Sequence, residues 1–167
     1  FNNDSASNAE KYGVLYTWSA AMNGAASSNS DPSGVQGVCP DGWHLPSDAE
    51  WTELEMYLGM CESEANLTYE VRGTNEGSKL AGNEYLWQDG NLENNTEFGT
   101  SGFTALPGGT RYNDGTFLNL AEITLFWSST EDNSSYSWDR NLDYRYTGVG
   151  KYSSYKTDGL SVRCIKD

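Results

Sequence analysis

The chain has 167 residues, enough for one domain with a buried core, and 13% of them are aromatic. Its formal net charge of −14 argues against nucleic acid as a partner, because the phosphates would be repelled. No stretch approaches the roughly 18 apolar residues that span a bilayer, so we expect no membrane insertion.

The charge is uneven along the chain. Residues 140–167 carry six basic side chains against three acidic ones, a net charge of +3, whereas the preceding part is strongly acidic. This basic end either neutralises an acidic body or forms a functional patch, and the sequence leaves both interpretations open.

The first predicted helix follows a short start. Residues 1–10, which open on Phe-Asn-Asn-Asp-Ser, are expected to be a flexible leader, and residues 11–167 to form a single domain. Leu15, Trp18 and Met22 recur at the spacing of one helical face. The polar run that follows them is typical of a surface loop.

The clearest local signal is a helix start at Ser47. Glu50 stands three residues later, which is the spacing of a capping box, in which each side chain binds a backbone N–H left free at the helix start. We expect the helix to end near Gly59, because glycine commonly terminates helices. Its buried stripe is predicted to consist of Trp51, Leu54 and Leu58.

The remaining elements are predicted to be short strands. Residues 61–95 show weak periodicity and are expected to be mostly irregular, and Asn113-Asp-Gly predicts a tight turn. Two helices followed by strands predict an α+β fold with an antiparallel sheet. The strand candidates are residues 102–106, 125–130, 142–146 and 160–165.

Five ordered segments carry a family resemblance. They are Tyr12-Gly-Val-Leu-Tyr-Thr-Trp, Cys39-Pro-Asp-Gly-Trp-His-Leu-Pro-Ser-Asp-Ala-Glu-Trp, Gly102-Phe-Thr-Ala-Leu-Pro-Gly-Gly, Phe126-Trp-Ser-Ser-Thr and Gly159-Leu-Ser-Val-Arg-Cys-Ile-Lys-Asp. From about residue 11 to the end, the chain resembles the Fibrobacter succinogenes major paralogous domain. The resemblance implies a C-type-lectin-like domain, with two helices packed on short antiparallel strands and long loops, and an extracellular location on a cell surface or virion.

The three cysteines allow one disulfide with one cysteine left over, and their spacing fits no zinc site. The resemblance places the bridge between Cys39 and Cys164, which implies an oxidising compartment. Cys61 is then expected to be a buried thiol, or alternatively to bond a segment outside this chain.

Catalysis is not expected. His44 is the only histidine, and within the Gly-Trp-His-Leu-Pro block it resembles a packing residue. The redox cysteine pair and the Arg-Gly-Gly-Ser-Trp block of the related formylglycine-generating enzymes are missing. We therefore predict no catalytic residues and no cofactor. The sugar-binding triplets of calcium-dependent lectins are also missing, although Asn113-Asp-Gly could supply oxygens to a structural calcium ion.

The segment 131–158 has the composition of a contact surface. Tyr, Trp and Arg bury large areas with few frozen torsions, while Ser and Asn adapt their hydrogen bonds. The alternative is a polar sheet face with aromatic side chains tucked inward and Leu142 and Val149 as inward anchors. The predicted ligand-binding residues are Tyr136, Trp138, Arg140, Asn141, Asp143, Tyr144, Arg145, Tyr146, Tyr152, Ser154 and Tyr155.

The resemblance suggests a recognition module for an unknown surface protein or glycan. Some domains of this kind resemble the variable proteins of diversity-generating retroelements, in which Asn codons become Tyr, Ser, Asp, Thr, Gly or Arg codons. The excess of such residues before Gly159 fits that process. The rival interpretations are a structural adhesin repeat without a specific ligand and a degenerate formylglycine-generating-enzyme fold.

Overall fold

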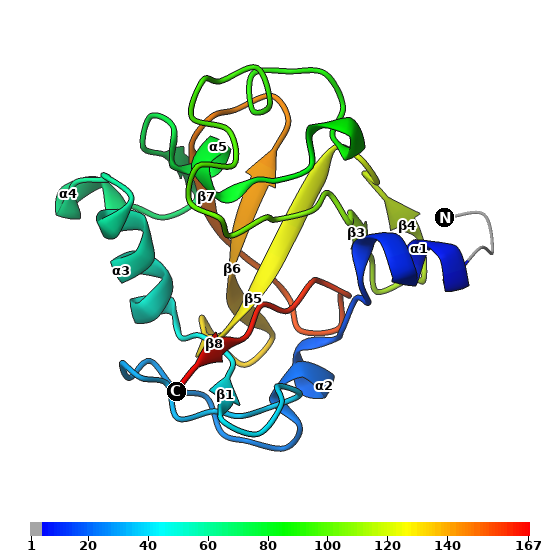
Figure 1. Cartoon of the computed structure of the whole chain (residues 1–167). Coiled ribbons are helices and arrows are strands. Elements are labelled where there is room, and N and C mark those ends of the chain that lie inside the picture. The colour runs from blue at the N-terminus through cyan, green and yellow to red at the C-terminus, as the bar shows by residue number, and fades with distance from the viewer. Residues whose placement is uncertain (1–4) are drawn as a thin grey trace.

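The computed structural model describes residues 5–167, which form an α+β fold around a central antiparallel sheet (Figure 1). None of the helices in this described range is long and apolar enough to cross a membrane. The helices are α1 (Ser5–Tyr12), α2 (Trp18–Met22), α3 (Asp48–Tyr57), α4 (Glu62–Ala65), α5 (Glu76–Leu80) and the 3-10 helix η1 (Glu84–Leu86). The strands are β1 (Trp43–His44), β2 (Glu70–Arg72), β3 (Thr110–Arg111), β4 (Phe117–Leu118), β5 (Ile123–Glu131), β6 (Tyr136–Asp143), β7 (Val149–Tyr155) and β8 (Ile165–Lys166).

The central sheet has the strand order β2-β7-β6-β5, and all of its pairs are antiparallel. Two small sheets, β1 with β8 and β3 with β4, lie outside it. The β3–β4 hairpin encloses Asn113-Asp-Gly, which confirms the predicted turn.

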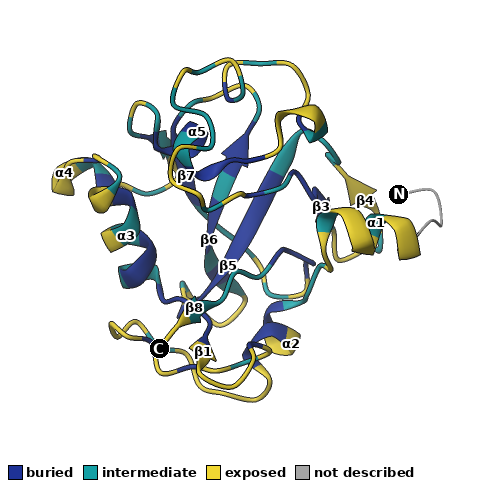
Figure 2. Cartoon of the chain, in the orientation of Figure 1, coloured by how far each residue is buried: buried dark blue, intermediate teal, exposed yellow. Residues whose placement is uncertain are grey.

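Both faces of the central sheet carry a hydrophobic cluster. Successive residues of β5 point to opposite faces and therefore contribute to both clusters. Phe126 packs in a cluster with Trp51 and Leu142, while Trp127 packs in a second cluster with Trp18 on the other side. Figure 2 shows β5 buried along almost its whole length. Leu142 and Val149 are buried inward anchors, as the alternation predicts. Trp43 is 39% exposed and belongs to neither cluster.

Helix α3 confirms the predicted capping box. The Glu50 N–H donates to Ser47 Oγ at 3.1 Å, and the Ser47 N–H donates to Glu50 Oε2 at 2.9 Å. Trp51 is buried in the stripe, and the two predicted leucines after it are half-buried against the same cluster. The helix ends at Tyr57, shortly before Gly59, whose φ of +122° suits glycine.

Several predicted boundaries differ from the structure. The first helical face is shorter than expected, because Thr17 caps α2 and leaves Leu15 outside it. The strand expected at 142–146 ends at Asp143, whose carboxylate accepts the Arg145 N–H at 2.9 Å and closes a turn. Residues 61–95, expected to be mostly irregular, contain α4, β2, α5 and η1.

Two further strand candidates form little regular structure. Of residues 102–106, only Ala105 makes an isolated bridge. Of residues 160–165, only Ile165 belongs to a strand, while Leu160 and Ser161 make isolated bridges. The first four residues of the predicted leader lie outside the described range, and residues 5–10 belong to α1.

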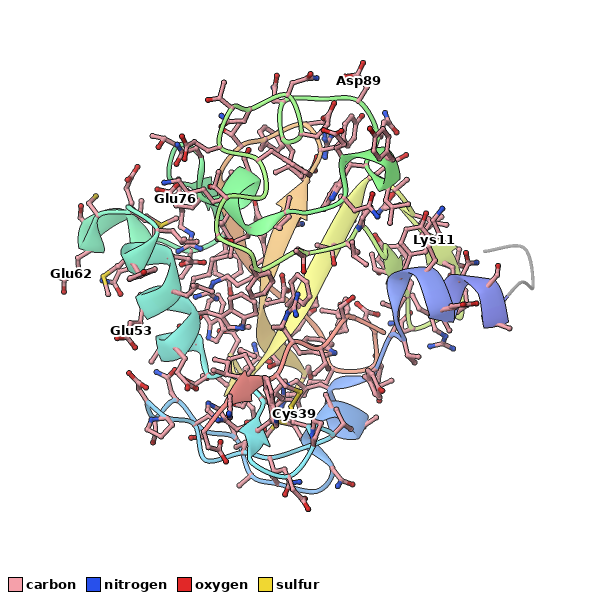
Figure 3. The ribbon with its side chains drawn as sticks, in the orientation of Figure 1. Lys11, Cys39, Glu53, Glu62, Glu76 and Asp89 are labelled. Carbon is pink, nitrogen blue, oxygen red and sulfur yellow. A yellow bond between two sulfur atoms is a disulfide. The ribbon has the colours of Figure 1, made fainter. Side chains whose placement is uncertain are left out.

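The structure confirms the bridge between Cys39 and Cys164. Their Cα atoms lie 5.8 Å apart, across 125 residues of chain, and the bond lies beside β1 and β8 (Figure 3). Cys61 is exposed, and its Sγ lies 3.2 Å from Ser63 Oγ, so the expectation of a buried thiol is wrong. The residue occupies the N-cap position of α4 without a capping hydrogen bond from its side chain, and solvent reaches the thiol.

Candidate functional site

The predicted contact residues do not form one continuous face. They divide among the two sides of the central sheet and the turn between β6 and β7. The register explains the division, because residues that alternate along β6 point to opposite sides. Tyr136 and Trp138 share one side with Ser153 and Tyr155.

One group lies at the Tyr136 end of β6. The rings of Tyr136 and Tyr155 stack at 4.3 Å, and a hydrogen bond between them raises the pKa of Tyr136. Trp138 contacts the ring of Tyr69 at 5.5 Å. Tyr69, which the sequence did not single out, is 57% exposed, and Tyr155 is 47% exposed. We name the group of Tyr69, Tyr136, Trp138, Ser153 and Tyr155 the aromatic face.

Polar contacts hold the aromatic face in place. The Tyr69 hydroxyl donates to Asp132 Oδ2 at 3.3 Å. Lys151 Nζ lies 5.5 Å from the Trp138 ring centroid and donates to Asp48 Oδ2 of α3 at 2.7 Å. These contacts restrain the side chains of the aromatic face before a ligand arrives. Less conformational entropy is therefore lost when the ligand binds.

Arg140 and Asp143 are corrections to the predicted contact set. Arg140 is fully buried, where its Nε donates to Glu55 Oε1 at 2.6 Å and its Nη1 to Asp48 Oδ1 at 2.7 Å. Asp143 is buried and accepts two N–H groups of the Arg145 side chain. Both charges serve the fold, because a buried charge needs a partner and each has one inside the chain.

Asn141, Tyr152 and Ser154 point to the opposite side of the sheet and are half-buried. They surround Asp139, which is fully buried and accepts a hydrogen bond from Ser154 Oγ at 2.8 Å. Burial raises the pKa of Asp139 to about 7, because the low-dielectric interior disfavours its charge. On this side the three predicted contact residues therefore lie around a buried acid.

The third group lies in the turn after β6. Arg145 stands between the rings of Tyr144 and Tyr146, at 5.9 Å and 5.6 Å from their centroids. Arg145 and Tyr146 are exposed, whereas Tyr144 is half-buried and packs against the core. A shallow polar pocket of about 370 Å³ adjoins them, and its other lining residues are Asn91, Asn94, Asn95 and Thr147.

His44 is buried between two carboxylates. Its Nε2 lies 2.6 Å from Glu50 Oε1, and its Nδ1 lies 2.6 Å from Asp167 Oδ1. Burial opposes the charge of the imidazole, but these two hydrogen bonds outweigh it and raise the pKa of His44. The side chain ties α3 to the end of the chain, which agrees with a structural role.

Two further features of residues 5–167 complete the description. No group of three or more His, Cys, Asp or Glu side chains in this range could hold a metal ion. A groove of about 940 Å³ lies between α3 and β8, and none of the predicted contact residues lines it.

Comparison with known proteins places the chain in a family. A family model described as the Fibrobacter succinogenes major domain matches residues 1–166, which is nearly the whole chain. No curated protein and no solved structure matches the chain.

Proposed function

The chain belongs to the Fibrobacter succinogenes major domain family, and from that premise we propose that it is a non-catalytic recognition module that binds its ligand through the aromatic face. Family membership is consistent with a surface module. The ligand would be a surface protein or a glycan, displayed to the chain outside the cell.

The observation that carries the proposal is the pair of ring contacts in which exposed Tyr155 meets half-buried Tyr136, with centroids 4.3 Å apart, and exposed Tyr69 meets Trp138. Tyr and Trp dominate binding energy at interfaces because they bury large areas and lose few torsions. Rings exposed on a rigid sheet gain more from being covered by a partner than from remaining in water.

The disulfide supports an extracellular location. Bridges such as Cys39–Cys164 form and persist in oxidising compartments, and the pair links β1 and β8, which are far apart in sequence. We place the module on a bacterial cell surface or a virion. Its resemblance to C-type-lectin-like domains agrees with the observed α+β fold and with a bridge that ties the last strand back to the first part of the chain.

The proposal is tested by a binding screen against glycans and bacterial surface proteins. Tyr155→Ala and Tyr69→Ala should each weaken binding about fivefold or more, which corresponds to about 1 kcal/mol. Tyr85→Ala is the matched control, because Tyr85 is 89% exposed on η1 and lies outside the aromatic face. If the folded variants at Tyr69 and Tyr155 bind a ligand as well as the wild type does, the contact surface lies elsewhere.

Diversification by a retroelement is a further part of the proposal. Tyr136, Ser153 and Tyr155 are residue types that such a process generates, and the register places them side by side at the strand ends. A reverse transcriptase gene and a near-identical template repeat beside this gene would support it. Tandem copies with a sorting signal would instead support a structural adhesin repeat.

A further inference from the structure

The groove between α3 and β8 lies outside the aromatic face. Helix α3 forms one wall with Leu54 and Tyr57, and the C-terminal segment forms the other with Arg163 and Ile165. Figure 1 shows β8 and the C-terminus below α3, where the loop before β1 also approaches. A groove of about 940 Å³ has room for a small ligand, since such sites usually measure roughly 300–1,000 Å³.

Arg163 is the most informative charge in this groove. Its guanidinium lies 4.2 Å from the Phe103 ring centroid and donates to the Phe103 carbonyl oxygen. Burial alone lowers the pKa of Arg163, and no carboxylate of residues 5–167 forms an ion pair with it. By contrast, Arg72, Arg140 and Arg145 each bind a carboxylate.

An unpaired and partly buried guanidinium is unexpected in this chain, which has 24 acidic residues. Its partners in the fold are one carbonyl oxygen and one ring, so the guanidinium loses hydration without gaining an opposite charge, and a bidentate carboxylate would compensate for the loss. Lys166, which also lines the groove and is exposed, adds a second positive charge to the lining. The Arg163 end of the groove therefore favours one anionic group.

The other end of the groove is acidic. The carboxyl groups of Asp31 and Glu53 are hydrogen-bonded to each other, which raises the pKa of Glu53. Glu53 extends from α3 in Figure 3. The remaining acids of the lining, Glu50 and Asp167, are held by His44. The Asp31–Glu53 pair would repel an anion but can accept hydrogen bonds from hydroxyl groups.

Exposed ring faces complete the lining. Trp43 is 39% exposed and Tyr57 is 86% exposed, and both line the groove. We propose that this groove is a second binding site, which takes an oligosaccharide that carries a sugar carboxylate. Arg163 receives the carboxylate, the rings of Trp43 and Tyr57 receive the apolar faces of sugar rings, and Asp31 with Glu53 accepts hydroxyl groups at the opposite end.

The charge of the whole chain limits the ligand further. A net charge of −14 repels polyanions, so densely sulfated or phosphorylated polymers are disfavoured. A ligand with one carboxylate among neutral hydroxyl groups can pair with Arg163 and also donate hydrogen bonds to Asp31 and Glu53. The site shares no residue with the aromatic face, so the two binding activities are separable by mutation.

The test is calorimetric titration of the whole chain with oligosaccharides that contain one uronic or sialic acid residue. Each is paired with the same oligosaccharide in which the carboxylate is reduced to an alcohol. Wild type should bind at least one acidic member about tenfold or more tightly than its reduced counterpart, because a charge-assisted pair is lost on reduction. Comparing the uronic and sialic members identifies the source of the carboxylate.

Variants then assign the contacts. Arg163→Gln should bind the acidic sugar about tenfold more weakly than wild type and should no longer distinguish it from its reduced form. Arg163→Lys should recover part of the preference for the acidic form. Tyr57→Ala should weaken both forms alike. Tyr85→Ala controls for loss of an exposed tyrosine. Lys11→Gln controls for loss of a positive charge, because Lys11 lies on α1 on the far side of the molecule (Figure 3).

Any one of four results would overturn the proposal. The first is that no acidic sugar of the panel binds wild type at millimolar concentration. The second is that the reduced sugars bind as tightly as the acidic ones. The third is that folded Arg163→Gln and Tyr57→Ala variants bind the acidic sugar like the wild type. Binding of an acidic peptide with no binding of any sugar would also exclude a glycan site.

Discussion

Glu55 is the central acid of a buried charge network, and Glu55→Gln is the perturbation that tests it. The Glu55 side chain is fully buried on α3. Its Oε1 accepts hydrogen bonds from Arg72 Nη2 at 2.8 Å and from Arg140 Nε at 2.6 Å, and its Oε2 accepts one from Arg72 Nη1 at 3.0 Å. Glutamine keeps the shape of the side chain and removes its charge.

The expected loss of stability depends on which carboxylate partners Arg140 and Arg72 keep after the substitution. Arg140 keeps its ion pair with Asp48, but in residues 5–167 Arg72 has no other carboxylate partner. The new amide also presents an NH₂ donor to two guanidinium groups that are themselves donors. Breaking a buried ion pair from one side costs about 3–5 kcal/mol, because the remaining charge stays uncompensated. That is a large part of the roughly 5–15 kcal/mol by which domains are stable.

Urea unfolding at neutral pH measures this cost. Glu53→Gln on the exposed side of the same helix is the control and should change the free energy of unfolding by about 0.5 kcal/mol or less. A loss below about 1 kcal/mol for Glu55→Gln would refute the reasoning, since the two arginines would then not depend on this carboxylate.

Three further predictions concern stability. Replacing Cys39 and Cys164 together by Ala should lower the free energy of unfolding by about 5 kcal/mol, because the bridge closes 125 residues of chain; non-reducing peptide mapping that pairs either cysteine with Cys61 would contradict the assignment. Burial raises the pKa of Asp139 to about 7, so the folded state keeps a proton that the unfolded chain releases above about pH 4. Stability should therefore fall between about pH 4 and 7 by on the order of 4 kcal/mol, and unfolding of Asp139→Asn should lack this slope; an equal slope in both proteins would show that Asp139 does not carry it. His44 has a raised pKa, so its ion pairs stabilise the fold below its ordinary pKa and are lost as the pH rises through the folded value. His44→Gln should thus lower the melting temperature more at pH 6 than at pH 9, and an equal loss at both would argue against a charged imidazole.

Local signals in the sequence were sufficient for some elements. The start of α3 was predictable because the capping pair, Ser47 and Glu50, contact only the backbone of their own turn. The end of β6 was not predictable, because the alternation at 142–146 continues through a turn that the Asp143 carboxylate closes. The bridge between Cys39 and Cys164 followed from the family resemblance.

Contacts between distant segments set the rest of the site. Tyr69 joins the aromatic face only because β2 pairs with β7, more than seventy residues later. Arginine is a residue type common at binding surfaces, but Arg140 is buried in ion pairs with Asp48 and Glu55 of α3. Neither the pairing of β2 with β7 nor the ion pairs of Arg140 can be recognised from a pattern in the sequence. Composition therefore indicated a contact segment, while the strand register decides which of its side chains reach solvent.

The central claim is that the aromatic face contacts the ligand, and the indole N–H signals of the six tryptophans test it in one titration. In a nitrogen-labelled sample, a ligand from the binding screen should shift the signal of Trp138 and leave the buried Trp51 and Trp127 in place. A ligand that binds the groove between α3 and β8 should instead shift the signal of Trp43. The account is contradicted if none of the screened ligands that saturate the protein moves the Trp138 signal.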